Sequence, residues 1–144
     1  MPIVTTPDDL RYVETSALLA AFLEADPAAR RAFRGASLIT SALTFAEAGR
    51  AVMRARKSGR LTPVQERSVL RALARFRSRC MVMAVTDDVL ADVSRPFPVE
   101  PLRTLDAIHL ATATQLADTP QLLAIVTRDH RIRANALALG HPVL

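Results

Sequence analysis

The sequence predicts an α/β domain in which a short parallel sheet of four to five strands is covered by helices on both faces. Short apolar segments alternate with longer helical segments along the chain, which is the pattern of such a sheet. The chain has 144 residues, of which 50% are hydrophobic, so we expect one domain over residues 1–144 with its own core. Its single cysteine excludes a disulfide framework and a cysteine-based zinc site.

Four segments have the composition of strands, and a fifth is expected near the C-terminal end. The segment 81–85 (MVMAV) is a continuous apolar run, which is typical of a strand buried on both faces, and we place its methionines in the core. A polar lead with Pro2 and Pro7 precedes the first strand. The expected strands are residues 11–13, 37–40, 81–85 and 122–127, with 141–143 as an edge strand.

Capping residues, prolines and glycines delimit the helices between these strands. Thr62 with Gln65 three residues later is a capping-box pattern, and Pro63 takes the first helical position. Thr15 and Ser16 offer capping hydroxyls to the first helix. The expected helices are 17–25 ended or kinked by Pro27, 43–57 stopped by Gly59, 63–78 with Val69, Leu70, Leu73 and Phe76 on one face, 87–95 ended by Pro96, 105–116 capped by Thr104, and 130–139 opened by Asp129.

The charge is positive and uneven. The net charge is +5, and between residues 50 and 79 nine arginines and Lys57 stand against the single acid Glu66. Such a surface binds a nucleic acid or an acidic partner, or it is an ordinary solvated helical face. With five Phe, one Tyr and no Trp, the chain is poorly suited to recognition by base stacking.

No apolar run reaches the roughly 18 residues that a membrane span needs. The first ten residues have neither a basic start nor a long apolar stretch, so the sequence does not predict a signal peptide there. We therefore expect a cytoplasmic protein with no membrane partner.

Four carboxylates fall at or near the ends of the expected strands. Glu14 ends the first strand and Asp129 follows the last clear one, whereas Glu47 lies one helical turn past the second strand. Asp106 sits in the first turn of an otherwise apolar helix. Because ligands bind at the carboxyl ends of parallel strands, we expect these four side chains to gather at one edge of the sheet.

Each acid also has an ordinary structural explanation. Asp129 can cap a helix, and Asp106 can favour a helix N-terminus through the dipole. Glu47 can pair with the arginines that follow it on its helix, and Glu14 can be an exposed charge at a strand end. Four acids at one edge are harder to explain in this way, because like charges repel unless a cation lies between them. Hard carboxylate oxygens without a histidine or cysteine cluster suit Mg²⁺ or Mn²⁺, which polarises a phosphodiester and activates water.

Four motifs in the right order resemble those of PIN domains, specifically the VapC-type toxin ribonucleases. They are residues 12–18 (YVETSAL), 41–47 (SALTFAE), 102–111 (LRTLDAIHLA) and 126–129 (VTRD), and together they span nearly the whole chain. The third motif is the most specific. The resemblance implies a PIN-like three-layer sandwich, a Mg²⁺ or Mn²⁺ site made of acids, and endonucleolytic cleavage of RNA to a 5′-phosphate and a 3′-hydroxyl. It also implies a homodimer and a cognate antitoxin protein that plugs the pocket.

By the same resemblance, Glu47, Asp106 and Asp129 match acids of the family, whereas Glu14 stands where the family usually has Asp. Glutamate is one methylene longer, and Mg²⁺ demands near-ideal octahedral geometry. Our hypothesis is that Glu14 still serves as a catalytic metal ligand with the other three.

Three hydroxyls and one imidazole lie beside these acids in the sequence. The hydroxyls of Thr15, Ser16 and Thr127 can hold a carboxylate or a metal-bound water, although Thr15 and Ser16 can equally cap a helix. His109, one turn after Asp106, is expected to be a buried histidine that donates to a neighbouring group rather than a proton shuttle. Cys80 is expected to be a core thiol.

Two alternatives remain at this stage. The first is a catalytically impaired PIN-like protein that binds RNA or the antitoxin without cleavage, and Glu14 is the feature that favours it. The second is a phospho-accepting receiver domain, which also gathers acids on a parallel sheet. The receiver-domain alternative is disfavoured because the only lysine, Lys57, lies in the arginine-rich segment rather than after the last strand.

Overall fold

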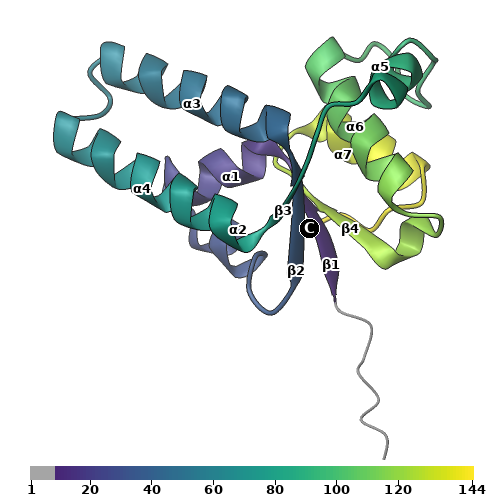
Figure 1. The fold of residues 1–144 in the computed structure, drawn as a ribbon, viewed down its shortest axis with the longest axis horizontal. Helices are drawn as coiled ribbons and strands as arrows, with labels where there is room; N and C mark the ends of the chain where they lie inside the picture. The colour runs from purple at the N-terminus through teal and green to yellow at the C-terminus, as the bar shows by residue number, and fades with distance from the viewer. Residues whose placement is uncertain (1–8) are drawn as a thin grey trace, which may run out of the picture.

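The computed structural model describes residues 9–144 and forms a four-stranded parallel sheet with helices on both faces (Figure 1). The polar lead with Pro2 and Pro7, and most of the segment examined for a signal peptide, lie outside the described residues. The strand order is β3-β2-β1-β4, and every adjacent pair is parallel. The elements are β1 (Leu10–Val13), α1 (Thr15–Phe22), α2 (Pro27–Arg31), β2 (Ser37–Ser41), α3 (Ala42–Lys57), α4 (Pro63–Arg79), β3 (Met81–Met83), α5 (Asp87–Val93), α6 (Thr104–Leu116), a short 3-10 helix (Pro120–Leu122), β4 (Leu123–Val126) and α7 (His130–Ala138).

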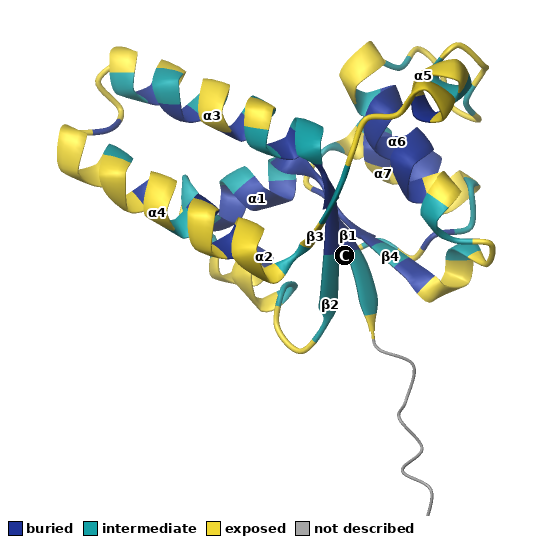
Figure 2. Cartoon of the chain, in the orientation of Figure 1, coloured by how far each residue is buried: buried dark blue, intermediate teal, exposed yellow. Residues whose placement is uncertain are grey.

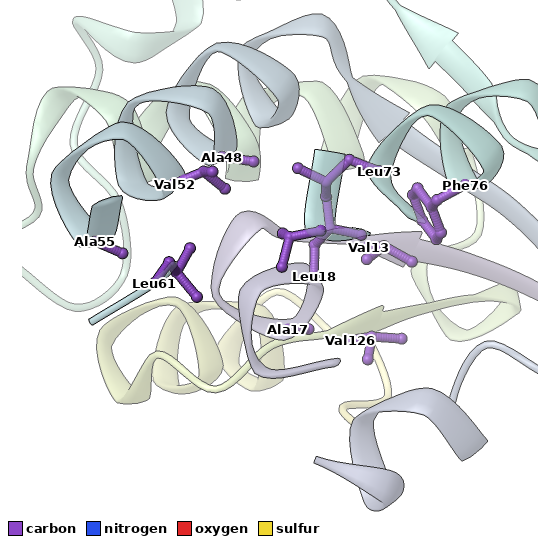
Figure 3. Close-up of a cluster of buried hydrophobic side chains, with 11 residues drawn as sticks. Val13, Ala17, Leu18, Ala48, Val52, Ala55, Leu61, Leu73, Phe76 and Val126 are labelled. Carbon is purple, nitrogen blue, oxygen red and sulfur yellow. The ribbon is translucent and has the colours of Figure 1, made fainter. Parts of the chain in front are cut away.

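The alternation of side chains along the strands divides the interior into two cores. Val13 and Val126 point to the face covered by α1, α3 and α4, where they join the larger core (Figure 3). Tyr12, Ile39 and Ile125 point to the opposite face, where they pack against α6 and α7. The predicted three-layer α/β sandwich is therefore confirmed.

The helices α3 and α4 form an antiparallel hairpin that extends beyond the sheet (Figure 1). Their inner faces are buried and their outer faces are exposed, as Figure 2 shows. The capping box of Thr62 and Gln65 is present at the start of α4, and Gly59 has a φ of 78°, which glycine adopts without strain. Leu70 is 44% exposed, so its predicted place on the buried face with Val69 was wrong.

The third strand differs most from its prediction. The run 81–85 was expected to be buried on both faces, but β3 is only three residues long and has a single neighbour, β2. Met81 is 60% exposed at this edge, whereas Met83 packs against the core of the Tyr12 face. An apolar run alone does not distinguish an edge strand from a central one.

Smaller differences concern the helix ends. Pro27 does not end the first helix but begins α2, which Asp26 caps. Neither Thr15 nor Ser16 caps α1, because Glu14 takes that position. Arg103 rather than Thr104 precedes α6, and it gives no side-chain cap.

The C-terminal segment and Cys80 lie close to where they were expected. Residues 142–144 pair with β4 through backbone hydrogen bonds, although they make only one bridge, Ile125 with Val143. Cys80 is half-buried and packs against the larger core, and burial raises the pKa of its thiol to about 11. Within residues 9–144, no helix combines the length and apolar character needed to cross a bilayer.

Candidate active site

The carboxyl ends of β1, β2 and β4 meet at one edge of the sheet, and the predicted acids lie there. Glu14 directly follows β1, and Asp129 lies three residues after β4 at the start of α7. Glu47 is in the second turn of α3, which begins where β2 ends, and Asp106 is in the first turn of α6. The parallel topology therefore brings four elements that are distant in the sequence to one place.

Glu14 is a buried carboxylate held by three protein donors. It is 5% exposed and caps α1, accepting a hydrogen bond from the backbone N of Ser16 at 3.0 Å. Its Oε2 accepts from the hydroxyl of Thr127 at 2.7 Å and from the hydroxyl of Ser16. Ser16 in turn accepts from the backbone N of Arg128 at 2.8 Å, which ties the segment after β4 to α1. The alternative explanation of Glu14 as an exposed charge at a strand end is thus excluded, because Glu14 is buried.

Glu47 is held from behind by a chain of buried polar groups. His109, which is 1% exposed, donates from Nε2 to Glu47 Oε1 over 2.6 Å, and Thr15 donates to the same oxygen over 2.7 Å. On its other side, His109 Nδ1 lies 2.8 Å from the hydroxyl of Tyr12, which is also 1% exposed. We call Tyr12, Thr15 and His109 the Glu47 support. Within the described residues, no arginine forms an ion pair with Glu47, so the alternative explanation by pairing along α3 does not hold.

The hydrogen bonds of this support decide the ionisation of Glu47. Burial alone would raise its pKa. The bonds from His109 and Thr15, with the nearby charge of His109, outweigh burial and hold the pKa of Glu47 below its ordinary value. Glu47 is therefore an anion at neutral pH, and only Oε1 is engaged by described protein donors.

Asp129 combines a capping role with a place in the site. Its Oδ1 accepts from the backbone N of Arg131 at 2.8 Å and of Ile132 at 3.0 Å, so it caps α7 as predicted. Its own backbone N donates to the hydroxyl of Thr127 at 3.0 Å. Thr127 thus bridges Asp129 and Glu14, while Asp129 Oδ2 accepts no hydrogen bond from residues 9–144.

Asp106 is the exception among the four acids. It is partly buried, and within the described part of the chain its carboxylate has no hydrogen-bond donor. Burial raises its pKa above the ordinary value, and the negative charges of Asp129 and Glu14 raise it further. Arg103 and His109 offset this only in part. Asp106 therefore lies close enough to Asp129 and Glu14 for their charges to disfavour its ionised form.

The four acids share the edge of the sheet without forming a closed ligand cage. Over residues 9–144, no three or more His, Cys, Asp or Glu side chains are arranged as a ready-made metal cluster. Three of the acids direct oxygens to protein donors, whereas Asp106 directs none. The site is thus a partly organised group of hard oxygen ligands with an excess of negative charge.

Sequence reasoning found the acids but missed part of their support. It placed His109 correctly as a buried histidine bonded to its neighbours, and it named Thr15, Ser16 and Thr127. It did not single out Tyr12, because a tyrosine in a strand reads as core. Tyr12 directly precedes Val13 in β1, so its side chain points to the opposite face of the sheet, toward α6. This alternation was the signal in the sequence that could have placed Tyr12 beside His109.

Comparisons with known proteins agree with this architecture. The PIN domain family model matches residues 11–137. The chain is 38% identical over 138 residues to Ribonuclease VapC35 from two Mycobacterium tuberculosis strains, CDC 1551 / Oshkosh and H37Rv, and the match covers 92% of this chain and 94% of the relative.

Two solved structures share the fold. PAE2754 from Pyrobaculum aerophilum has a TM-score of 0.57 and 24% identity, with 93% of this chain and 82% of the other covered. A toxin-antitoxin complex from Klebsiella pneumoniae has a TM-score of 0.57 and 23% identity, with coverage of 93% and 95%. The chain belongs to the PIN-domain family and resembles its VapC-type members, which excludes the receiver-domain alternative.

Proposed function

We propose that this PIN-domain chain is a metal-dependent endoribonuclease that acts as the toxin of a toxin–antitoxin pair. The observation that carries the proposal is that four acids gather at the carboxyl ends of the strands, where Asp106 has no hydrogen-bond donor within residues 9–144 and is repelled by Asp129 and Glu14. A fold does not retain such a cost for stability alone, because the repulsion makes the folded state less favourable. The 38% identity to a protein named as a ribonuclease supports the reaction type.

The residues present fit a hard divalent cation such as Mg²⁺ or Mn²⁺. The donor set consists of carboxylate oxygens, which these ions prefer, and Asp106 has both oxygens available. Glu14, Glu47, Asp106 and Asp129 are the residues that would hold it. When bound, the cation supplies charge neutralisation, polarisation of the phosphodiester and activation of water for in-line attack.

The chain's own residues prepare this chemistry. The Glu47 support fixes one carboxylate oxygen and keeps Glu47 ionised. Thr127 and Ser16 fix Glu14, and the backbone of α7 fixes Asp129. Three acids are thereby oriented before substrate binds, which lowers the reorganisation needed during the reaction. Asp106, whose carboxylate accepts no hydrogen bond within residues 9–144, is the residue whose removal we expect to be most damaging.

The partners follow from the same family resemblance. We propose an RNA substrate, a cognate antitoxin protein that covers the acids, and a homodimer. The net charge of +5 supports a polyanionic substrate.

The experiment that tests the function is cleavage-site mapping on total RNA with added Mn²⁺. Wild type is compared with Asp106→Asn and with Asp118→Asn, a matched control at an exposed acid after α6. We expect discrete cuts with 5′-phosphate ends for wild type and the control, and a loss of about 100-fold for Asp106→Asn. RNA that wild type binds but leaves intact would instead favour the impaired alternative.

The role of Glu14 needs its own variants. Glu14→Asp tests the extra methylene, and Glu14→Ala removes the carboxylate. If Glu14→Ala leaves both Mn²⁺ affinity and cleavage unchanged, Glu14 is a helix cap and nothing more. We expect both to fall, because Glu14 adds to the charge at Asp106.

A further inference from the structure

A row of basic side chains begins at the site and runs along α3. Arg50, Arg54 and Lys57 follow Glu47 at spacings of three, seven and ten residues. In an α-helix these spacings place all four side chains on one face. With a rise of 1.5 Å per residue, the row extends to about 15 Å beyond Glu47 along the helix axis. We call Arg50, Arg54 and Lys57 the α3 row.

The opposite face of α3 is the one that packs. Its buried residues are Thr44, Ala48, Val52 and Ala55, and three of them belong to the larger core. The α3 row is exposed at each of its three positions (Figure 2 shows α3 exposed on its outer side). The row is thus free of any packing role in the fold.

The charges of the α3 row are not neutralised by the protein. Within residues 9–144, no carboxylate lies within ion-pair distance of any member. Over the same residues, the one side-chain hydrogen bond of the row is a weak one, from Arg50 to the sulfur of Met53 at 3.6 Å. Three positive side chains in a row along the helix, without neighbouring carboxylates, attract an anion whose charges are regularly spaced.

The nature of the surface favours a nucleic acid over a protein. None of the exposed large hydrophobic residues of the described chain lies on α3. Protein interfaces generally need an apolar centre, whereas binding to phosphates needs only charge. By contrast, a 460 Å³ cavity between α1, α2 and α4 is lined by Phe22, Phe33 and Phe76 as well as by arginines, so it has the apolar centre that the α3 row lacks.

We propose that the α3 row binds successive phosphates of the RNA strand that leads away from the cleavage point. This proposal rests on the proposed function, because it takes the acid site as the place where the strand is cut. Arg50, the first member of the row, lies one helical turn from Glu47, so a strand bound on the row is already aligned with the acids. The contacts are to the backbone, so they contribute affinity and alignment but no base specificity.

Binding without cleavage tests the α3 row separately from the reaction. A fluorescein-labelled oligouridylate is titrated with protein in EDTA, and its anisotropy is followed over a series of salt concentrations. The test variant is Arg50→Gln/Arg54→Gln/Lys57→Gln. The matched control, Arg67→Gln/Arg71→Gln/Arg75→Gln, removes the same charge from exposed positions on α4. Melting temperatures of both variants check that the fold is intact.

We expect the α3 variant to bind the oligouridylate about tenfold more weakly at low salt. Its slope of log affinity against log salt should be less steep by about 2, because each phosphate contact on a single strand contributes about 0.7. The α4 control should change affinity by less than about twofold. These three results together support the proposal.

Other outcomes overturn it. Equal losses in both variants would mean that net charge, not the α3 row, determines binding. If the α3 variant binds the oligouridylate with the affinity and salt slope of wild type, the α3 row does not bind RNA. If that variant also binds poly-glutamate more weakly than wild type does, the row binds an acidic protein instead. If wild type binds RNA through the α3 row but cuts no RNA with Mn²⁺, the proposed function is wrong, whereas the proposal that the row binds RNA is supported.

Discussion

Glu47 and Asp106 carry the same charge at the same edge of the sheet, yet their surroundings are opposite. Glu47 accepts two short hydrogen bonds from buried residues, and its pKa is lowered. Asp106 has no donor in the described chain, and burial and two neighbouring acids raise its pKa. One carboxylate is stabilised by folding and the other is destabilised by it.

This difference separates two kinds of contribution to a site. The bonds to Glu47 hold its geometry and favour the fold, because they satisfy groups that would otherwise be buried without partners. Asp106 lowers the stability of the fold and keeps both oxygens available, which suits a ligand for a cation. We therefore expect the free energy of unfolding to fall when the support of Glu47 is removed and to rise, by less, when the charge of Asp106 is removed.

The largest effect is expected for His109→Leu. This change removes the hydrogen bonds that His109 makes with Glu47 Oε1 and with the buried hydroxyl of Tyr12. We therefore expect a loss of roughly 2–4 kcal/mol in the free energy of unfolding. Urea unfolding followed by circular dichroism measures it. RNA cleavage should fall by about tenfold or more even where the variant is folded.

His109→Gln is the control for that prediction. Its amide can still donate to Glu47, so we expect smaller losses of both stability and cleavage than for His109→Leu. Equal losses in the two variants would mean that the imidazole acts by filling space, and the contrast between Glu47 and Asp106 would lose its basis.

A smaller effect is expected for Tyr12→Phe, which removes one hydroxyl and keeps the ring. His109 Nδ1 then lacks its partner at 2.8 Å, so the free energy of unfolding should fall by about 1 kcal/mol. A double-mutant cycle with His109→Leu measures the coupling. The two changes should be far from additive, because they act on one hydrogen bond.

Asp106→Asn should have the opposite sign. Removing this charge relieves its repulsion with Asp129 and Glu14, so we expect a gain of roughly 0.5 kcal/mol at neutral pH after allowance for solvent screening. Thermal unfolding without metal measures it. A variant that is less stable than wild type would show that the charge of Asp106 does not strain the fold.

That gain should depend on pH. The pKa of Asp106 is raised in the folded state, so its ionised form penalises folding at neutral pH, and the penalty disappears as pH falls through the raised pKa. The advantage of Asp106→Asn should therefore shrink as pH falls through the raised pKa and vanish only below the ordinary pKa of Asp, about 3.9. The lowered pKa of Glu47 acts in the opposite direction, since its stabilisation is lost only at still lower pH. Unfolding curves of both proteins across this range check the sign.

The fold was predictable because its signals are local. The capping box at Thr62, the glycine after α3 and the alternation of strands with helices are all encoded within a few residues. The length of β3 was not predictable, because it depends on which strand lies at the edge of the sheet. An edge position is a property of the whole topology.

The site was predictable in its members but not in its contacts. The four acids follow from where strands end. That Thr127 would bond Glu14, and that Glu47 would meet His109 rather than an arginine of its own helix, depends on contacts between residues 62 or more positions apart. The burial of Tyr12 and His109 gives these contacts their strength, and burial of individual side chains emerges only when the layers pack.

The strand order has a consequence for how the protein is made. Beta-strand β4 is translated last among the four strands but lies beside β1, the first, and it is followed by Thr127 and Asp129. A nascent chain that has not yet released this segment from the ribosome lacks part of the acid group and the bond that fixes Glu14. The order of synthesis therefore delays the assembly of the centre until translation of the chain is nearly finished.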